Sequence, residues 1–198
     1  DLQQSLSYCQ GVIEKRSTLP ILSNVLIDAS NSKLKITATD LDLIFINEIK
    51  NVEIAEEGKT TTTSSIMYDI IRKFSPGKKI NFELTGESKI HLESEKSVFN
   101  LNCITAAEFP LTDENFSGND FIIKSKKLLK LLNKCKFSVS NDETRHYLSG
   151  IFLHLTEKEN KNFLTAVATD SHRMGISKTL LSEEIKFEPI ILPKKTIF

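Results

Sequence analysis

Residues 148–154 read Leu-Ser-Gly-Ile-Phe-Leu-His, and residues 168–174 read Ala-Thr-Asp-Ser-His-Arg-Met. Both stretches resemble an earlier part of the chain, where residues 22–28 read Leu-Ser-Asn-Val-Leu-Ile-Asp and residues 38–43 read Ala-Thr-Asp-Leu-Asp-Leu. The second copy follows the first by 126 to 130 positions, whereas solenoid repeats are roughly 20 to 50 residues long. The pattern therefore predicts repeated domains. The first copy has Asp42 and Leu43 where the second has His172 and Arg173, so this His-Arg pair is a candidate for function.

Length and composition indicate an ordinary globular protein of 198 residues, enough for one or two domains with a core. The 26 basic and 26 acidic side chains cancel, which argues against a wholly basic nucleic-acid-binding protein but permits local basic patches. No apolar run approaches the ~18 residues that span a membrane, and no signal peptide is expected. The three cysteines are single and widely separated, which favours a reduced, cytoplasmic protein without a disulfide framework.

One helical pattern alternates with groups of strand patterns along the chain. Helices are expected at residues 1–13, from a cap at Ser64 or Ser65 to residue 74, at 126–136 after an N-cap at Ser125, and from Pro193 onward. Strands are expected at residues 21–28, 33–39, 43–50, 60–63, 79–84, 89–93, 97–103, 121–123, 147–155, 163–169, 174–178 and 189–192. The repeating unit is therefore strand, helix, strand, strand, strand.

Two such units make each long repeat, so we predict an α+β fold built from repeated βαβββ units. Residues 1–116 are expected to form a first domain that lacks its leading strand, and residues 117–198 the first half of a second domain. The polar stretch at residues 110–119 is the expected linker. By this count, we expect the gene product to continue beyond both ends of the chain.

A lysine-rich helix is the strongest charge feature. Six lysines and no acid fall within residues 124–136, and Lys126, Lys130 and Lys134 lie four apart. We expect the opposite, apolar face to consist of Leu128, Leu129, Leu131, Leu132 and Cys135. Two interpretations stay open: a solvated lysine face, or sequence-independent contact with phosphates. Weaker basic clusters follow the first two helices at Lys15, Arg16, Arg72, Lys73, Lys78 and Lys79.

No pattern predicts catalysis, a metal or a cofactor. Residues 169–173 contain the residue types of a Ser-His-Asp triad, but neighbours in an extended segment point to opposite faces and cannot form the relay. The four histidines lack partners at metal-ligand spacing. Residues 145–148 and 172–174 combine polar groups with apolar side-chain surface next to the repeated strands. They either pack as strand ends on the core or border a groove for a short peptide.

Five ordered motifs that extend over essentially the whole chain resemble those of the bacterial sliding clamp, the β subunit of DNA polymerase III. They are Arg-Ser-Thr-Leu-Pro-Ile-Leu-Ser-Asn at 16–24, Ala-Thr-Asp-Leu-Asp at 38–42, Ala-Ala-Glu-Phe-Pro at 106–110, Phe-Ser at 137–138 with Thr-Arg-His-Tyr-Leu-Ser-Gly at 144–150, and the motif at 168–174. The resemblance implies a DNA-clamp fold, in which helices line a hole for DNA and antiparallel sheets lie outside. A clamp subunit has three domains, so the third would be absent from this chain.

The resemblance also implies a noncatalytic processivity factor of DNA replication, which encircles duplex DNA as a homodimeric ring when full length. Its implied partners are duplex DNA, the DNA polymerase III alpha subunit, the clamp loader and other proteins with a clamp-binding motif. Its implied place is the cytoplasm, at replication forks on the nucleoid, with no membrane partner. The alternative is a nonreplicative α+β scaffold that binds proteins through the same groove, and a hydrolase is a distant third.

Individual residues acquire expected roles from the same resemblance. DNA contacts are expected at Arg16, Arg72, Lys73, Lys126, Lys127, Lys130 and Lys134. The peptide-binding groove is expected at Leu148, Thr169, Ser171, His172, Arg173 and Met174. The subunit interface is expected at Lys96, Phe99 and Leu101. The chain departs from the family pattern at Ser171, where Gly is usual, at Met174, where Leu is common, and at Asp142, where some clamps have a DNA-contacting Gln, so no DNA contact is assigned to Asp142.

Overall fold

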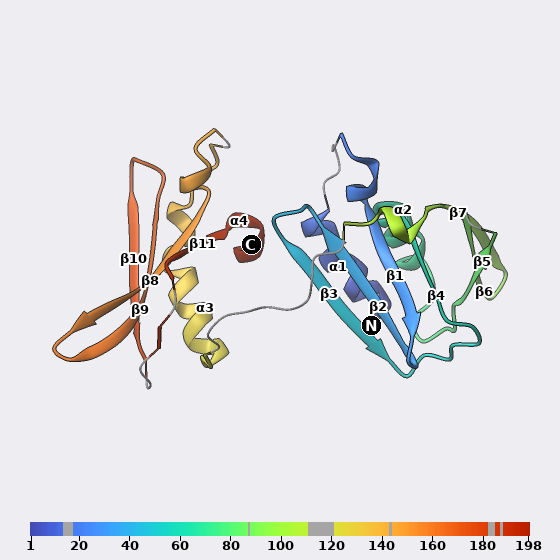
Figure 1. The fold of residues 1–198 in the computed structure, drawn as a ribbon, viewed down its shortest axis with the longest axis horizontal. Helices are drawn as coiled ribbons and strands as arrows, with labels where there is room; N and C mark the ends of the chain where they lie inside the picture. The colour runs from blue at the N-terminus through green and yellow to red at the C-terminus, as the bar shows by residue number, and fades with distance from the viewer. Residues whose placement is uncertain (14–17, 87, 111–120, 143, 182–184, 187) are drawn as a thin grey trace. The chain divides into compact units, whose positions relative to one another are not determined.

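The computed structural model describes residues 1–198 except 14–17, 87, 111–120, 143, 182–184 and 187. The chain divides into two compact units, Asp1–Thr112 and Asp113–Phe198, each with its own sheet and hydrophobic core (Figure 1). Arg16 and nearly all of the expected linker at residues 110–119 lie outside the described residues. The domain bounds at residues 116 and 117 therefore stay a prediction.

The first unit is a seven-stranded sheet of order β3-β2-β1-β4-β7-β6-β5, in which every pair of neighbours is antiparallel. Its strands are β1 (Asn24–Ser30), β2 (Lys33–Thr39), β3 (Ile44–Lys50), β4 (Gly58–Thr63), β5 (Asn81–Thr85), β6 (Lys89–Ser94) and β7 (Ser97–Ile104). Its helices are α1 (Leu2–Val12) and α2 (Ser64–Ile71), with short 3-10 helices η1 (Pro20–Ser23) and η2 (Ala106–Glu108). The order β4, α2, β5, β6, β7 is one complete βαβββ unit, as the sequence predicts.

Apolar side chains from both helices and from alternating strand positions make the first core. Leu6 and Cys9 of α1 and Met67 of α2 are fully buried against Val25 and Ile36 of the sheet. Because side chains alternate across a strand, Val25 and Ile27 face the helices. Burying a side chain of this size contributes roughly 1.5–3 kcal/mol each to stability.

The second unit is a four-stranded antiparallel sheet of order β10-β9-β8-β11, with helix α3 packed on β9 and β10. Its elements are α3 (Ser125–Asn133), η3 (Lys136–Ser138), η4 (His146–Leu148), β8 (Gly150–Lys158), β9 (Lys161–Thr169), β10 (Met174–Leu180), β11 (Ile190–Pro193) and α4 (Lys194–Ile197). A Cβ atom at Gly175 would lie 3.0 Å from Cys135 Cα. Glycine therefore lets the backbone of β10 approach the end of α3 closely.

Several expected element bounds are wrong. Residues 121–123 form no strand, although Phe121 and Ile123 pack against the second core while Ile122 is 97% exposed. Apolar alternation predicts this burial, but a strand also needs a regular hydrogen-bond ladder with a neighbour. Residues 21–23 and 147–148 lie in 3-10 turns rather than strands, because an apolar run does not distinguish the two at a strand entrance.

Two helices begin and end at other residues than expected, and the buried face of α3 is narrower than expected. α2 ends at Ile71 and α3 at Asn133, and Ser64 and Ser125 are their first residues, with Thr63 and Lys124 at the cap positions. Leu129 was expected on the buried face of α3 but is 59% exposed, because only one side of a helix this short can meet the sheet. No helix in the described ranges is long and apolar enough to cross a membrane.

Candidate functional site

The two copies of the repeated motif fold into the same aspartate-centred turn. In the second copy, Asp170 Oδ1 accepts hydrogen bonds from the backbone N–H groups of His172 and Arg173, both at 3.0 Å. In the first, Asp40 Oδ1 accepts from the N–H groups of Asp42 at 3.2 Å and Leu43 at 2.8 Å. The threonine before each aspartate also accepts an N–H bond, from Ser171 at 3.2 Å and from Leu41 at 3.0 Å.

Asp170 serves this turn structurally, not as a catalyst. The N–H groups of Arg173 and His172 lower the pKa of Asp170 from 3.8 to about 2. Its second oxygen accepts from Arg173 Nε at 2.8 Å, so the carboxylate holds Arg173 and not the imidazole of His172. The geometry therefore gives no Ser-His-Asp relay. Burial raises the pKa of Cys9 to about 12, which disfavours the reactive thiolate there.

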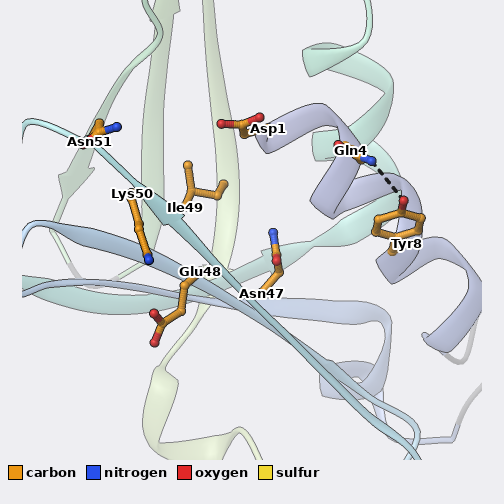
Figure 2. A pocket seen from close by; sticks show the side chains of 8 residues that line it. All are labelled: Asp1, Gln4, Tyr8, Asn47, Glu48, Ile49, Lys50 and Asn51. Carbon is orange, nitrogen blue, oxygen red and sulfur yellow. Dashed lines mark hydrogen bonds between the residues drawn. The ribbon is translucent and has the colours of Figure 1, made fainter. Parts of the chain in front are cut away.

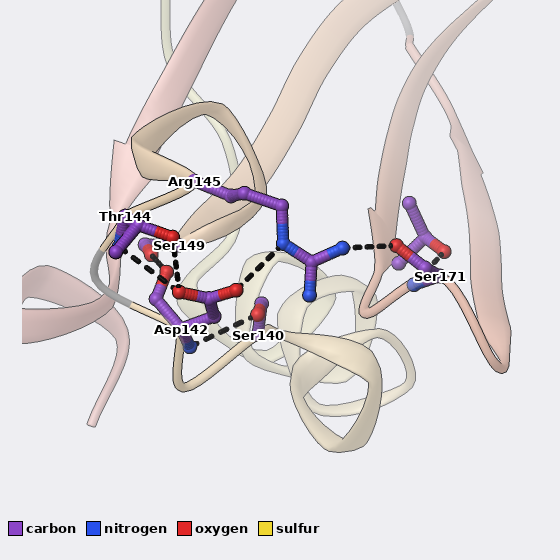
Figure 3. Close-up of polar contacts among 7 residues, drawn as sticks. Ser140, Asp142, Thr144, Arg145, Ser149 and Ser171 are labelled. Atoms are coloured by element: carbon purple, nitrogen blue, oxygen red, sulfur yellow. Dashed lines mark hydrogen bonds and ion pairs between the residues drawn. The ribbon is translucent and has the colours of Figure 1, made fainter.

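A second network joins the segment before β8 to this turn (Figure 3). Asp142 Oδ2 accepts from Arg145 Nε at 2.8 Å, and Arg145 Nη1 donates to Ser171 Oγ at 2.8 Å. Asp142 Oδ1 accepts from the hydroxyl of Thr144 at 2.6 Å and from its N–H at 3.0 Å. The Thr144 side chain, its N–H and then Arg145 hold the pKa of Asp142 below 3.8. The contact between Arg145 and Ser171 holds these two side chains next to each other, although the two residues are 26 positions apart in sequence.

Ser171 itself has a left-handed backbone, with φ of 77°. That region favours glycine, so the serine costs conformational energy of the order of 1 kcal/mol. Its hydroxyl accepts the Arg145 bond, an interaction that glycine could not make.

Exposed apolar and polar side chains gather around the turn. Met174 is 59% exposed, and His172 and Arg173 are exposed, while Leu148 is half-buried. The guanidinium of Arg173 lies 5.6 Å from the ring centre of Phe137, which is 54% exposed. Sequence reasoning missed Phe137 as a site residue, although an aromatic residue directly after an amphipathic helix was a usable signal. It also missed the role of Asp142 as the acceptor that holds Arg145.

A second candidate surface is the lysine face, which we define as Lys126, Lys127, Lys130 and Lys134. All four side chains are exposed, and none makes an ion pair with another described residue. Leu131 of α3 is 1% exposed in the second core, so the helix packs through this residue while the four lysine side chains stay exposed to solvent. Cations in the first turn are also disfavoured by the helix dipole, which attracts anions there.

The remaining predicted residues are dispersed in the first unit. Arg72 Nη2 pairs with Asp69 Oδ1 at 3.0 Å, and Lys73 is exposed just after α2. Lys96 lies exposed in the turn between β6 and β7. Phe99 on β7 is 37% exposed with its ring 6.0 Å from that of Phe74, whereas Leu101 is buried in the first core.

A pocket of about 410 Å³ lies elsewhere, between the start of α1 and strand β3 (Figure 2). It is lined by Asp1, Gln4, Tyr8, Asn47, Glu48, Ile49, Lys50 and Asn51, and none of the predicted site residues is among them. Gln4 Nε2 donates to the hydroxyl of Tyr8 at 3.0 Å. No group of three or more His, Cys, Asp or Glu side chains among the described residues is placed to hold a metal ion.

Two family models match the chain in order. One is described as the N-terminal domain of the DNA polymerase III beta subunit and matches residues 1–113. The other is described as the central domain of the same subunit and matches residues 122–198. Together they account for nearly the whole chain.

Curated relatives and solved structures agree with these matches. The chain is 32% identical to the beta sliding clamp of Caulobacter vibrioides, over 99% of this chain and 53% of that protein. It is 31% identical to the Escherichia coli K12 beta sliding clamp, over 99% of this chain and 52% of that protein. The chain thus spans about half the length of the curated relatives it matches.

Among solved structures, a Caulobacter crescentus beta sliding clamp superposes with a TM-score of 0.93 at 32% identity, over 99% of this chain and 52% of that one. A DnaN sliding clamp from Bartonella birtlesii, solved bound to griselimycin, gives 0.91 at 35% identity, over 98% and 52%. These superpositions confirm the predicted clamp fold of repeated βαβββ units.

Proposed function

The chain belongs to the DNA polymerase III beta subunit family, and from this membership we propose that it is part of a noncatalytic replication clamp. The full-length protein would close as a homodimeric ring around duplex DNA and tether the replicative polymerase in the cytoplasm, at forks on the nucleoid. The observation that carries this proposal is the ordered match of two successive clamp domains in one chain.

The lysine face supports contact with DNA. Three of its four lysines lie on α3 and Lys134 directly follows it, and none has an ion-pair partner among the described residues. Mutual repulsion on a helix costs a few tenths of a kcal/mol per pair, and a phosphate would relieve it. Long lysine side chains reach phosphates without reading bases, which suits a protein that must slide. We assign further DNA contacts to Arg72 and Lys73, and keep Arg16 as an expectation outside the described residues. Because Arg72 is already paired with Asp69, we expect it to contribute less than the lysines.

The turn of the second copy supports a peptide-binding role. We define the peptide surface as Leu148, Thr169, Ser171, His172, Arg173 and Met174, and add Phe137, because the Arg173 guanidinium lies over its ring. Exposed Met174 and Phe137 offer apolar contact, and the turn presents polar groups beside them. Short motifs of the polymerase alpha subunit, the clamp loader and other clamp-binding proteins are the ligands that we propose for it.

A ring needs contacts between subunits, and we propose that strand β7 supplies them through Lys96 and Phe99. Leu101 is buried behind these residues in the first core, so its proposed part is to support the strand and not to touch the partner. Val98, at 53% exposed, is a further apolar residue of this strand.

DNA topology distinguishes the clamp from a nonreplicative scaffold. We expect the full-length protein, once loaded by a clamp loader, to stay on a nicked circular plasmid through gel filtration and to leave when one restriction cut makes the plasmid linear. Encircling alone explains release at free ends, because charge contacts are the same on both substrates. Equal retention on circular and linear DNA would favour a scaffold that binds DNA only by charge.

Replacing Met174 by lysine is expected to weaken binding of a polymerase alpha-subunit peptide by about 20-fold, since it places a charge in the apolar part of the peptide surface. Arg173→Ala should weaken it less, by about fivefold, through loss of the guanidinium and its contact with Phe137. Fluorescence anisotropy with a labelled peptide measures both. Ile44→Lys, at the matching position of the first copy, is the control, and unchanged affinity in Met174→Lys would count against the peptide surface.

A further inference from the structure

Asp142 and Ser171, from two separate segments of the second unit, lie on either side of one arginine, Arg145 (Figure 3). Arg145 Nε donates to Asp142 Oδ2 and Arg145 Nη1 donates to Ser171 Oγ, each at 2.8 Å. The contact with Ser171 needs a side-chain hydroxyl, and the contact with Asp142 pairs the guanidinium with a carboxylate. The guanidinium is held from both sides by residues 29 positions apart, Asp142 in the segment before β8 and Ser171 in the turn of the proposed peptide surface.

Asp142 is itself firmly positioned. The side chain and N–H of Thr144 bond to its first oxygen at 2.6 and 3.0 Å, and its own N–H donates to Ser140 Oγ at 3.1 Å. The backbone oxygen of Asp142 accepts from Ser149 Oγ at 3.3 Å. The carboxylate that holds Arg145 therefore cannot swing toward a ligand without breaking several bonds.

These two bonds determine what the arginine can recognise. A guanidinium carries five N–H donors, so two bonds leave about three for a ligand. Its charge, however, is already balanced by Asp142 at 2.8 Å, so a second carboxylate gains little attraction. The remaining donors suit a neutral acceptor, such as a backbone or side-chain carbonyl oxygen.

We propose that Asp142 and Ser171 are positioning residues that fix Arg145 as a neutralised donor at the rim of the peptide surface, selecting neutral carbonyl acceptors over carboxylates in the bound segment. This inference rests on the proposed peptide-binding function and names a specificity determinant of that site. Fixing the guanidinium in advance removes the cost of ordering a long side chain on binding. Asp142 thus acts on the ligand only through Arg145.

Two variants isolate this role. Asp142→Asn keeps an oxygen for Thr144 but presents an NH2 group that cannot accept from Arg145. Ser171→Gly removes the Arg145 acceptor while relieving the left-handed backbone, so it should fold at least as well as the parent protein. We expect each to weaken binding of an alpha-subunit peptide by about fivefold, and neither to change it further in an Arg145→Ala background.

The salt dependence of peptide affinity is a second measurement, and it would not change if Asp142 only stabilised the fold. In Asp142→Asn, the Arg145 charge is no longer balanced. A variant of the alpha-subunit peptide that carries glutamate at its neutral polar positions should therefore gain affinity relative to the unaltered peptide by about fivefold at low salt, and lose that gain at high salt. The probes are the two peptides, and affinity is measured by anisotropy between 50 and about 500 mM salt. Asp69→Asn, which breaks the Arg72 ion pair of the same sequence spacing in the first unit, is the matched control.

The measured affinities distinguish failure of the positioning role from failure of the proposed peptide-binding function. In one outcome, the parent protein binds the peptide and Met174→Lys weakens the binding, but Asp142→Asn and Ser171→Gly change neither the affinity nor its salt dependence. The positioning role would then be wrong, while the peptide-binding role of the surface would still hold. Additive losses in the Arg145→Ala background would also overturn it, because the two residues would then act independently of Arg145. If the parent protein does not bind the peptide at all, the peptide-binding function fails first.

Discussion

Lys126→Glu, Lys130→Glu and Lys134→Glu together are expected to reduce retention of the full-length clamp on circular DNA by about 100-fold at about 100 mM salt. Each lysine that contacts a phosphate releases a counterion, so removing three contacts should flatten the slope of log affinity against log salt by about 2.7. The helix should survive, since a glutamate at position 126 lies in the first turn, where the helix dipole favours a negative charge. Half-life on nicked plasmid at several salt concentrations measures both effects.

A matched reversal separates local contact from net charge. Glutamate in place of Lys158, Lys161 and Lys178 changes the total charge equally, but these lysines lie on the strands of the second unit and not on α3. Lys178 alternates with Gly175 and Ser177, which are buried toward α3, so it lies on the opposite face of the sheet. We expect at most a severalfold effect from this control. Equal losses from both triple variants would remove the lysine face from the DNA-binding role.

Gly150→Ala is expected to destabilise the second unit by about 3 kcal/mol. A Cβ atom on residue 150 would lie 2.4 Å from the backbone oxygen of Leu192 and 2.6 Å from Cγ2 of Ile191. The clash is with the neighbouring strand, because Gly150 pairs with Pro193 in the β8–β11 ladder, and backbone atoms cannot rotate away. Chemical denaturation followed by circular dichroism measures the loss, and hydrogen exchange should show earlier opening of β11.

Gly11→Ala serves as the control for this change. Nothing lies within 4 Å of the position a Cβ would take on Gly11, which is inside helix α1. Alanine there should stabilise the first unit by roughly 0.5–1 kcal/mol, because it restricts the unfolded chain and favours the helix. If Gly150→Ala did not lower the free energy of unfolding, β11 would not pair with β8 as closely as the structure shows.

Sequence reasoning predicted the elements whose periodicity is strong. Strand β2 has the predicted bounds, and the unit of one helix followed by three antiparallel strands is confirmed. Phe121 and Ile123 alternate as strand residues do and pack against the second core, but alternation indicates burial and not whether a neighbouring strand completes a hydrogen-bond ladder. The exposed Leu129 is a similar case, since the width of a buried helix face depends on what packs against it.

The candidate site was predictable to the extent that its residues are adjacent in sequence. Residues 169–174 form one turn, so their proximity is local and the repeat revealed it. The bond between Arg145 and Ser171 joins segments 26 residues apart, and no periodicity specifies such a contact. Phe137 beneath Arg173 is also a tertiary contact, so only the folded chain discloses it.

The aspartate-centred turn separates folding from recognition. In both copies, backbone N–H groups of the turn donate to a threonine hydroxyl and to an aspartate carboxylate, and these bonds do not depend on the side chains that follow. The three positions after the aspartate are Leu-Asp-Leu in one copy and Ser-His-Arg in the other, on the same frame. Such a turn can therefore exchange its exposed side chains, and with them its ligand, at little cost to the stability of the sheet that carries it.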